Sequence, residues 1–439
     1  MNARLVALLS LERCRKDDAW LSAVLDGAVK REGLDRREAA LASALALGVL
    51  QNRDYYDFLL AQFCSTPVEK LEARVLDILR LGVCQLDALD RIPPRAAVNE
   101  TVALCKAAGL SRASALVNAV LRRVAESRGH WPEVPGKGTP RYLATRYSHP
   151  IWLAEKLVAE RGYDFAEALF SADNTPAPLD IQINTLNTSK GKYAGLLDER
   201  AISYALPPFP DGCISLSGCA VGDLPGFAEG LFYVQDRAAR KTVDLAGLED
   251  GMRVLDACAC PGGKSFASAM NMHGVGEILA CDIHEKKLST VRDTAARLGL
   301  EIVRTERRDA RDFVPDYENS FDAVIADVPC SGLGVIRKKP ELRFKREEDL
   351  AALPAIQRDI LNNLSRYVRP GGVLIYSTCT ILREENEAVV GDFLSAHEDY
   401  FPCDFFIGER KSHKGCYTFY PHVDGTDGFF VSKMKRNAT

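Results

Sequence analysis

Apolar residues recur with helical spacing along the first 125 residues of the chain. Between Leu5 and about Ala125 they show helical periodicity, for example in the series Ala39, Leu41, Ala44, Leu45, Leu47 and Leu50. No proline interrupts this pattern before Pro67, and the next prolines come only in the turn Ile92–Pro94. The pattern predicts an all-helical domain over residues 1–130.

A different pattern follows. Residues 128–140 contain three prolines and three glycines and lack both helical and strand periodicity, which predicts a linker. Residues 141–235 then combine a helical stretch, Ile151–Phe170, with short strand-like runs at Leu179–Ile183 and Gly230–Gln235. This combination favours a small α+β module.

From residue 252 onward, apolar runs rich in β-formers alternate with helical patterns. The runs are Met252–Asp256, Glu277–Asp282, Phe321–Asp327 and Gly372–Thr378, and the helices are expected near 264–272, 285–298, 352–368 and 384–396. Such alternation is typical of a parallel, doubly wound α/β sheet, so residues 236–439 are predicted to form a Rossmann-like domain. Sheets of this kind bind ligands beyond the carboxyl ends of their strands.

Composition narrows the class of protein. Of the 439 residues, 47% are hydrophobic and 26% charged, as in ordinary globular proteins, and no apolar run is long enough for a membrane span. The thirteen cysteines are scattered and odd in number, so we expect reduced thiols in a cytoplasmic protein, with Cys84 and Cys105 serving as packing residues. The formal charge of −4 divides into +3 for residues 1–130 and −7 for the rest, so the helical segment is the more basic one.

The first predicted strand of the α/β domain leads into the loop Cys258–Lys264, which contains adjacent glycines. The loop is neither the G-x-G-x-x-G fingerprint nor a P-loop, so it suits nucleotide phosphates poorly. Asp282, at the end of the next strand, has the spacing expected for a carboxylate that binds ribose hydroxyls, and Asp309 follows the third strand. Each feature alone could be a tight turn or a helix cap, but the ordered set favours a ligand with adenosine and no pyrophosphate, namely S-adenosylmethionine.

Two cysteines follow adjacent predicted strands: Cys330 comes after Asp327, and Cys379 ends the run Ser377–Cys379. A single cysteine in such a place is usually inert packing, but a pair beside a carboxylate could face one substrate. Neither cysteine has a C-x₂-C partner, and Cys258 and Cys260 lie too close together for a zinc site, so we expect no metal.

These motifs resemble the RsmB (Sun) family of ribosomal RNA 5-methylcytosine methyltransferases over nearly the whole chain. In the catalytic half the matching stretches are Val234–Asp236, Cys258–Lys264, Asp327–Gly334, Val335–Glu341, Ser377–Cys379, Glu385–Glu387 and Asp427–Phe430. The helical domain is similar to the antitermination factor NusB through Leu47–Leu50, Ile78–Gln85, Arg91–Pro94 and Val117–Arg122. The chain departs from the usual family pattern at Cys260, where alanine is common, at Asp309, which lacks a flanking Gly-Asp-Gly turn, and at Lys339, where histidine is common.

The resemblance implies a role for each motif. It assigns the attack on carbon 6 of cytosine to Cys379, and proton removal and enzyme release to Cys330, while Asp327 would bind the ring edge. The implied S-adenosylmethionine site comprises Cys258, Ala259, Cys260, Pro261, Gly262, Gly263, Lys264, Asp282, Asp309 and Asp327. The expected substrate is a single-stranded or locally flipped cytidine of 16S ribosomal RNA, because a stacked base could not enter such a pocket. We expect a monomer without a membrane partner.

Two alternatives remain open at this point. The same chemistry could act on transfer RNA, although the NusB-like domain disfavours this. The chain could also be a non-catalytic RNA-binding assembly factor, which the presence of both Cys330 and Cys379 disfavours.

Overall fold

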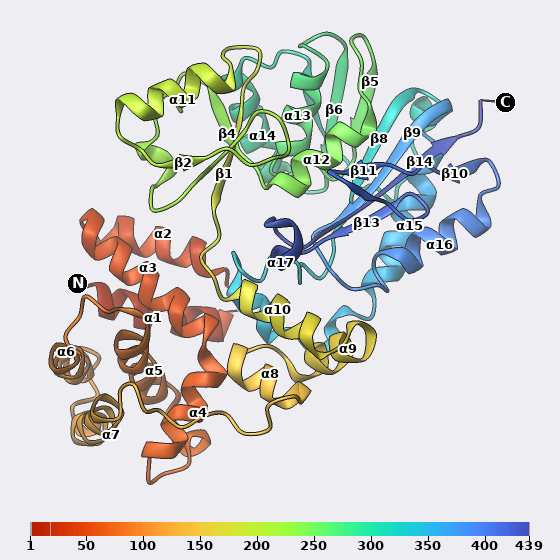
Figure 1. The fold of residues 1–439 in the computed structure, drawn as a ribbon. Helices are drawn as coiled ribbons and strands as arrows, with labels where there is room; N and C mark the ends of the chain where they lie inside the picture. The colour runs from red at the N-terminus through yellow and green to blue at the C-terminus, as the bar shows by residue number, and fades with distance from the viewer. Residues whose placement is uncertain (1, 18, 439) are drawn as a thin grey trace. The chain divides into compact units, whose positions relative to one another are not determined.

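The computed structural model describes residues 2–17 and 19–438, and the chain forms two compact units (Figure 1). The first unit contains residues 1–175 and 336–347, and the second contains 176–335 and 348–439. Among the described residues, no helix has the length and apolarity needed to cross a membrane. The ranges 1–130, 141–235 and 236–439 remain predictions, because a division by packing does not show which segments fold independently.

The first unit begins with a helical bundle, as the apolar spacing predicts. Its elements are α1 (Ala3–Asp17), α2 (Leu21–Glu32), α3 (Arg36–Gln51), α4 (Arg53–Phe63), η1 (Val68–Lys70), α5 (Ala73–Ala88), α6 (Pro94–Ala107), η2 (Ser111–Ala113) and α7 (Ser114–Glu126). Helix α5 packs against α1, α3, α4, α6 and α7. A Cβ atom on Gly82 would lie 2.4 Å from Leu121, and one on Gly48 would lie 2.6 Å from the sulfur of Cys84. Close helix packing therefore explains these glycines, and the packing role expected for Cys84 and Cys105 is confirmed by their complete burial.

Helices α8 (Pro140–Tyr147), α9 (Ile151–Arg161) and α10 (Tyr163–Asp173) complete the helical part of this unit, after a segment without helix or strand at residues 127–139. The helical stretch predicted over 151–170 is present, but it consists of two helices. Gly162 interrupts it with a φ of +86°, a conformation that glycine adopts without steric cost. Ser148, after α8, accepts hydrogen bonds of 3.1 Å from the backbone N–H groups of Asp54 and Tyr55, which ties α8 to the first turn of α4.

The second unit begins with the expected small α+β module. Its antiparallel sheet has the strand order β2-β3-β1-β4, from β1 (Leu179–Ile183), β2 (Tyr204–Ala205), β3 (Cys213–Leu216) and β4 (Phe232–Val234), with α11 (Lys190–Glu199) and η3 (Val221–Asp223). Ile181, Tyr193 and Phe232 lie in its apolar core. The Nδ2 atom of Asn184 donates to the carbonyl oxygens of Gly230 and Leu298, which joins the module to the end of α14 (Glu285–Leu298).

The large sheet of the second unit has the order β10-β14-β9-β8-β5-β6-β7, with β13 paired to β14. Its strands are β5 (Arg253–Asp256), β6 (Glu277–Asp282), β7 (Val303–Arg307), β8 (Phe321–Asp327), β9 (Val368–Thr378), β10 (Tyr400–Pro402), β13 (Cys416–Phe419) and β14 (Phe429–Arg436). Strands β5 to β9 are parallel, as predicted. The predicted Rossmann-like sheet is mixed beyond these strands, because β10, β13 and β14 add antiparallel pairings.

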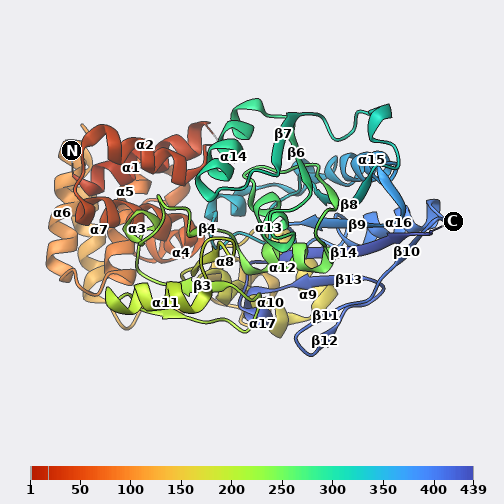
Figure 2. The same ribbon diagram turned by 90° about the horizontal axis from the view of Figure 1, so that it is seen from above.

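Helices cover both faces of this sheet (Figure 2). Helices α12 (Arg237–Ala246), α13 (Gly263–Asn271) and α14 share one apolar core with the sheet, and α15 (Leu353–Ser365) and α16 (Glu387–Ala396) share the other. The remaining short elements are η4 (Pro315–Tyr317), η6 (Glu347–Leu350), α17 (Pro421–Asp424), and the strands β11 (Phe406–Ile407) and β12 (Arg410–Lys411), which pair with each other. The helix predicted over 352–368 ends earlier, at Ser365, because Val368 already pairs with Phe321 as the start of β9.

Candidate active site

The loop after β5 makes a tight turn into α13. Gly262 has a φ of +108°, and a Cβ atom there would lie 2.4 Å from the ring of Phe266. A Cβ atom on Gly263 would meet the side chain of Gln235 at 3.0 Å. The N–H group of Ala259 donates to the carbonyl oxygen of Cys281, so Cys258–Lys264, with Pro261 in the turn, is tied to β6. Close packing therefore accounts for the paired glycines, independently of a ligand.

Two cysteines of this loop lie among carboxylates. Burial raises the pKa of the Cys258 thiol well above its ordinary value, and the charges of Asp327, Asp256 and Asp282 raise it further. Burial, followed by the charge of Asp282, raises the pKa of Cys260 to about 12. Both thiols are therefore protonated at neutral pH and unsuited to nucleophilic attack. Asp256, Asp282 and Asp327 end β5, β6 and β8. Because all three act on the pKa of Cys258, these strand ends lie close together around its thiol.

The two acids predicted to contact the cofactor lie at the ends of neighbouring parallel strands. Asp282 accepts a 2.9 Å hydrogen bond from the N–H group of His284. Asp309 forms a 2.6 Å ion pair with Arg311, and the hydrogen bond from Arg311 lowers the pKa of the Asp309 carboxyl group. Asp309 also lines a small cavity of about 20 Å³ together with residues including Leu255 and Ala310.

Cys330 and Cys379 come together, as their positions after adjacent strands predict. Their sulfur atoms lie 3.2 Å apart, at hydrogen-bond distance. The hydrogen bond with Cys379 raises the pKa of Cys330 well above its ordinary value, and burial adds to this effect. Either sulfur atom could be the donor in this contact, so each thiol lies where its S–H group could stabilise a thiolate on the other.

Asp327 has defined partners on both carboxylate oxygens. Its Oδ2 atom lies 2.5 Å from Nζ of Lys264, and its Oδ1 atom accepts a 2.8 Å hydrogen bond from the hydroxyl of Ser377. Lys264 is only 8% exposed, and its ammonium group lies 5.1 Å from the ring centroid of Phe429. Lys264, at the start of α13, is therefore a buried ion-pair partner of Asp327 rather than a solvated charge.

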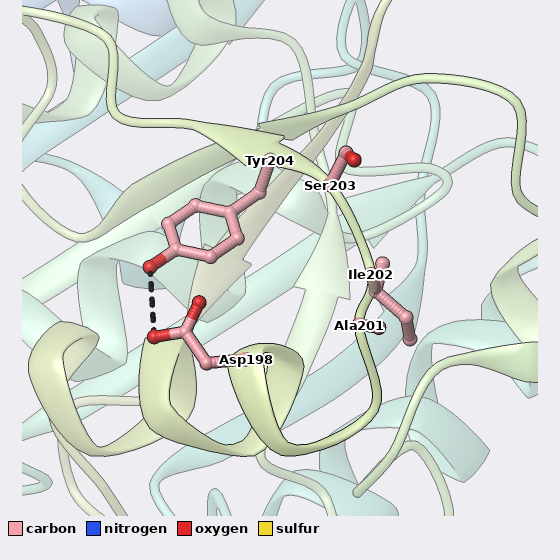
Figure 3. Close-up of a pocket in the computed structure, with 5 residues that line it drawn as sticks. All are labelled: Asp198, Ala201, Ile202, Ser203 and Tyr204. Carbon is pink, nitrogen blue, oxygen red and sulfur yellow. Dashed lines mark hydrogen bonds between the residues drawn. The ribbon is translucent and has the colours of Figure 1, made fainter.

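A shallow hollow on the α+β module lies apart from these residues in the chain. Asp198, Ala201, Ile202, Ser203 and Tyr204 line it, and the Tyr204 hydroxyl donates a 3.4 Å hydrogen bond to Asp198 (Figure 3). None of the predicted site residues lines this hollow.

Comparison with known proteins shows the family of the chain. A "probable ribosomal RNA small subunit methyltransferase B" of Bacillus subtilis (strain 168) is 32% identical over 99% of both chains. The profile of the family described as "16S rRNA methyltransferase RsmB/F" matches residues 244–435. The chain belongs to the RsmB/F methyltransferase family. A "ribosomal RNA small subunit methyltransferase B" of Xanthomonas campestris pv. campestris is 35% identical over 90% of this chain and 87% of its own.

Other parts of the chain match as well. The NusB family profile matches residues 1–126, and a ferredoxin-like domain of RsmF/B-like methyltransferases matches 149–221. Among solved structures, "PH0851" has the same fold over 99% of both chains, with a TM-score of 0.82 and 22% identity. The NusB-like helical domain, the middle module and the Rossmann-like domain of the RsmB/F family are thus all present.

A buried network behind the two thiols was not predicted. Glu385 is 1% exposed, and its Oε2 atom accepts hydrogen bonds from the N–H group of Ser331 and from Gln357. Gln357 also donates to the carbonyl oxygen of Pro329, and the hydroxyls of Ser331 and Thr380 lie 2.6 Å apart. The network joins the residues beside Cys330 to those beside Cys379. The RsmB/F motif Glu385–Glu387 carried a signal for Glu385, whereas Gln357 lies inside an ordinary helical pattern and carried none.

Proposed function

We propose that this chain uses S-adenosylmethionine to methylate carbon 5 of a cytidine in 16S ribosomal RNA through a covalent adduct of Cys379. The observation that carries the proposal is the 3.2 Å contact between the sulfur atoms of Cys330 and Cys379. The ion pair of Asp327 with Lys264 lies in the same unit, at the end of the strand that precedes Cys330. Membership of the RsmB/F family supports the substrate class.

The ends of β5, β6 and β7 fit the methyl donor. Oδ1 of Asp256 is buried without a hydrogen-bond partner among the described residues, and Asp282 offers a partly exposed carboxylate at the neighbouring strand end. We assign cofactor binding to Cys258–Lys264, Asp282, Asp309 and Asp327, where carboxylates suit hydroxyl and ammonium groups. When bound, S-adenosylmethionine supplies an electrophilic methyl group.

Cys379 begins the reaction in this proposal. Carbon 5 of cytosine is too electron-poor to take a methyl group unaided, so the thiolate of Cys379 first adds to carbon 6. Ser377 and Lys264 hold the Asp327 carboxylate in one orientation, in which it stabilises the protonated ring edge as charge develops. Cys330 takes no part in the attack, because it keeps its proton.

Cys330 acts at the end of the reaction. After methyl transfer the proton on carbon 5 passes to a water molecule, and its bonding electrons restore the ring double bond while the carbon–sulfur bond breaks. The electron pair of that bond returns to Cys379. The proton of Cys330, at hydrogen-bond distance, stabilises the departing thiolate and so assists release of the RNA.

In this proposal the RNA enters the site as a single strand or with the target base flipped out. The protein acts as a monomer in the compartment where ribosomes assemble.

The test is a map of 5-methylcytosine in RNA from a strain that lacks the gene. One position in 16S ribosomal RNA should lose its methyl group and regain it with the wild-type gene but not with Cys379→Ala. Loss in transfer RNA instead would reassign the substrate, and no loss in any RNA would favour a non-catalytic assembly factor.

A further inference from the structure

Residues 336–347, which we name the strap, connect the catalytic unit to the helical unit in an unusual way. The loop that carries Cys330 belongs to the second unit, which the chain leaves after Val335. The next twelve residues pack within the first unit, and the chain resumes its contacts with the second unit at Glu348.

Arg343, in the short helix η5 (Pro340–Phe344) of the strap, is only 3% exposed and binds the carboxyl ends of three helices. Its guanidinium group donates to the carbonyl oxygens of Gln51 at the end of α3, of Tyr147 and Ser148 at the end of α8, and of Asp173 at the end of α10, and to Oδ1 of Asn174. Helix ends leave such carbonyls unpaired and carry partial negative charge, so a buried cation is stabilised there. Burial lowers the pKa of Arg343 to about 10, which leaves it charged at neutral pH.

Other strap residues add contacts with the helical unit. Oε1 of Glu341 accepts a 3.0 Å hydrogen bond from the N–H group of Leu21, and Trp152 donates to the carbonyl oxygen of Lys345. The guanidinium group of Arg53 lies 3.7 Å from the ring centroid of Phe344. The strap is therefore anchored along its length.

The chain just before the strap is equally constrained, within the catalytic unit. The N–H group of Gly334 donates to the carbonyl oxygen of Cys379, and its own carbonyl oxygen accepts from Gly428. A Cβ atom on Gly334 would lie 1.9 Å from the carbonyl oxygen of Gly428, so the two backbones pack too closely for any side chain. Only Val335 separates this fixed point from the first residue of the strap, which leaves almost no slack in the chain.

We propose that the strap is a tether through which the helical unit holds the loop Pro329–Gly334 in place, with Arg343 as a positioning residue for Cys330. This inference goes beyond the proposed function and rests on it only for the methylation readout. A lysine at position 343 could not replace the arginine, because its ammonium group lacks the planar fork that reaches acceptors on three helices.

The sharpest test adds slack without removing any contact. Three residues, Gly-Ser-Gly, are inserted between Val335 and Ile336, and the control protein carries the same insertion between Lys137 and Gly138. We expect the first insertion to lower kcat for RNA methylation by about tenfold or more, with KM for RNA and cofactor affinity unchanged, because small displacements of a reacting group are costly. The control insertion should leave kcat unchanged.

A second readout does not depend on methylation. The rate at which iodoacetamide alkylates Cys330, followed by mass spectrometry, should rise about threefold in the Val335 insertion and in Arg343→Lys, and should not change in Arg31→Lys, an exposed arginine of the same unit. If the wild-type chain methylates no cytidine, the proposed function fails while this readout still tests the strap. Unchanged alkylation and kcat in the Val335 insertion would overturn the proposal. A loss of cofactor binding with a collapsed unfolding temperature would also overturn it, because the strap would then be a folding element.

Discussion

Cys330 and Cys379 are chemically identical residues that their surroundings make different. The hydrogen bond between the two sulfur atoms, together with burial, raises the pKa of Cys330 well above its ordinary value. Sequence spacing predicts that the two thiols meet, but it could not assign their protonation, which depends on burial and on a 3.2 Å contact. Lys264 is a similar case, because its partners Asp327 and Phe429 lie on two strands, 63 and 165 residues further along the chain.

The first prediction separates the two thiols. Cys379→Ala should abolish both methylation and any covalent complex, because carbon 5 never becomes nucleophilic without the adduct. Cys330→Ala should still form the adduct but fail to resolve it, so a denaturation-resistant protein–RNA complex should accumulate. Denaturing gel electrophoresis with labelled RNA measures both results. A trapped band in Cys379→Ala but not in Cys330→Ala would exchange the two roles.

The second prediction concerns Asp282. If its carboxylate binds both ribose hydroxyls, Asp282→Ala should weaken S-adenosylmethionine binding by about 2–4 kcal/mol, from one charge-assisted hydrogen bond per hydroxyl. Isothermal titration calorimetry measures this, with Asp293→Ala, at an exposed site on α14, as the matched control. Equal affinity in Asp282→Ala and the control would remove Asp282 from the site.

The third prediction uses the pKa of Asp256, which burial raises from 3.8 to about 6. Because the folded state binds this proton more tightly than the unfolded state, its contribution to stability is complete below about pH 4 and is lost as the pH rises to about 6. Asp256→Asn keeps the acceptor for Ser265 and removes the charge, so it should raise the free energy of unfolding at pH 7 by about 1–3 kcal/mol. Urea unfolding between pH 4 and 7 measures this. Asp316→Asn, at an exposed site, is the control and should keep the pH dependence of the wild type. If Asp256→Asn also kept that pH dependence, Asp256 would not be the titrating group.

Whole elements were more predictable than single contacts. The strands ending at Asp256, Asp282 and Asp327 were found from the sequence, because buried parallel strands are continuous apolar runs between helices. Strand β14 was missed: its residues Phe429–Arg436 contain three cations after the apolar start, and its pairing with β9 is a long-range contact that no local pattern specifies. The strap was missed for the same reason, since its partners lie between 169 and 320 residues away in the chain.

The fourth prediction tests the turn that links β8 to the strap. Gly334→Ala would place a Cβ atom 1.9 Å from the backbone of Gly428, and neither backbone can move without displacing Cys379. We expect a loss of about 1–3 kcal/mol in the free energy of unfolding, as for other overpacked sites, and strongly reduced methylation. Gly391→Ala on α16 is the control, because nothing lies within 4 Å of its Cβ position. Thermal unfolding should show Gly391→Ala unchanged or slightly more stable, and an equally stable Gly334→Ala would contradict the close packing.

At the scale of the whole molecule, the chain crosses between its two units after residues 175, 335 and 347. Such a division cannot be found from the composition of linkers, since the crossing at 335 lies inside a sequence motif without the glycine and proline signals of residues 128–140. It also limits how the protein can be cut. A fragment that begins at residue 141 keeps Arg343 but loses the Gln51 carbonyl that Arg343 binds, and it exposes the side of α8 that packs on α4.

The fifth prediction uses that fragment to locate RNA binding. Residues 1–130 carry a net charge of +3 against −7 for the rest, so an isolated 141–439 fragment should lose most of its affinity for ribosomal RNA. Its affinity should also depend less on salt, since fewer phosphate contacts release fewer counterions. Filter binding from low to high salt measures both effects, and calorimetry with S-adenosylmethionine confirms that the fragment is folded. Equal RNA affinity of fragment and whole chain at every salt concentration would instead make the helical segment a protein-binding or folding element, because phosphate contacts contributed by it cannot vanish without changing the salt dependence.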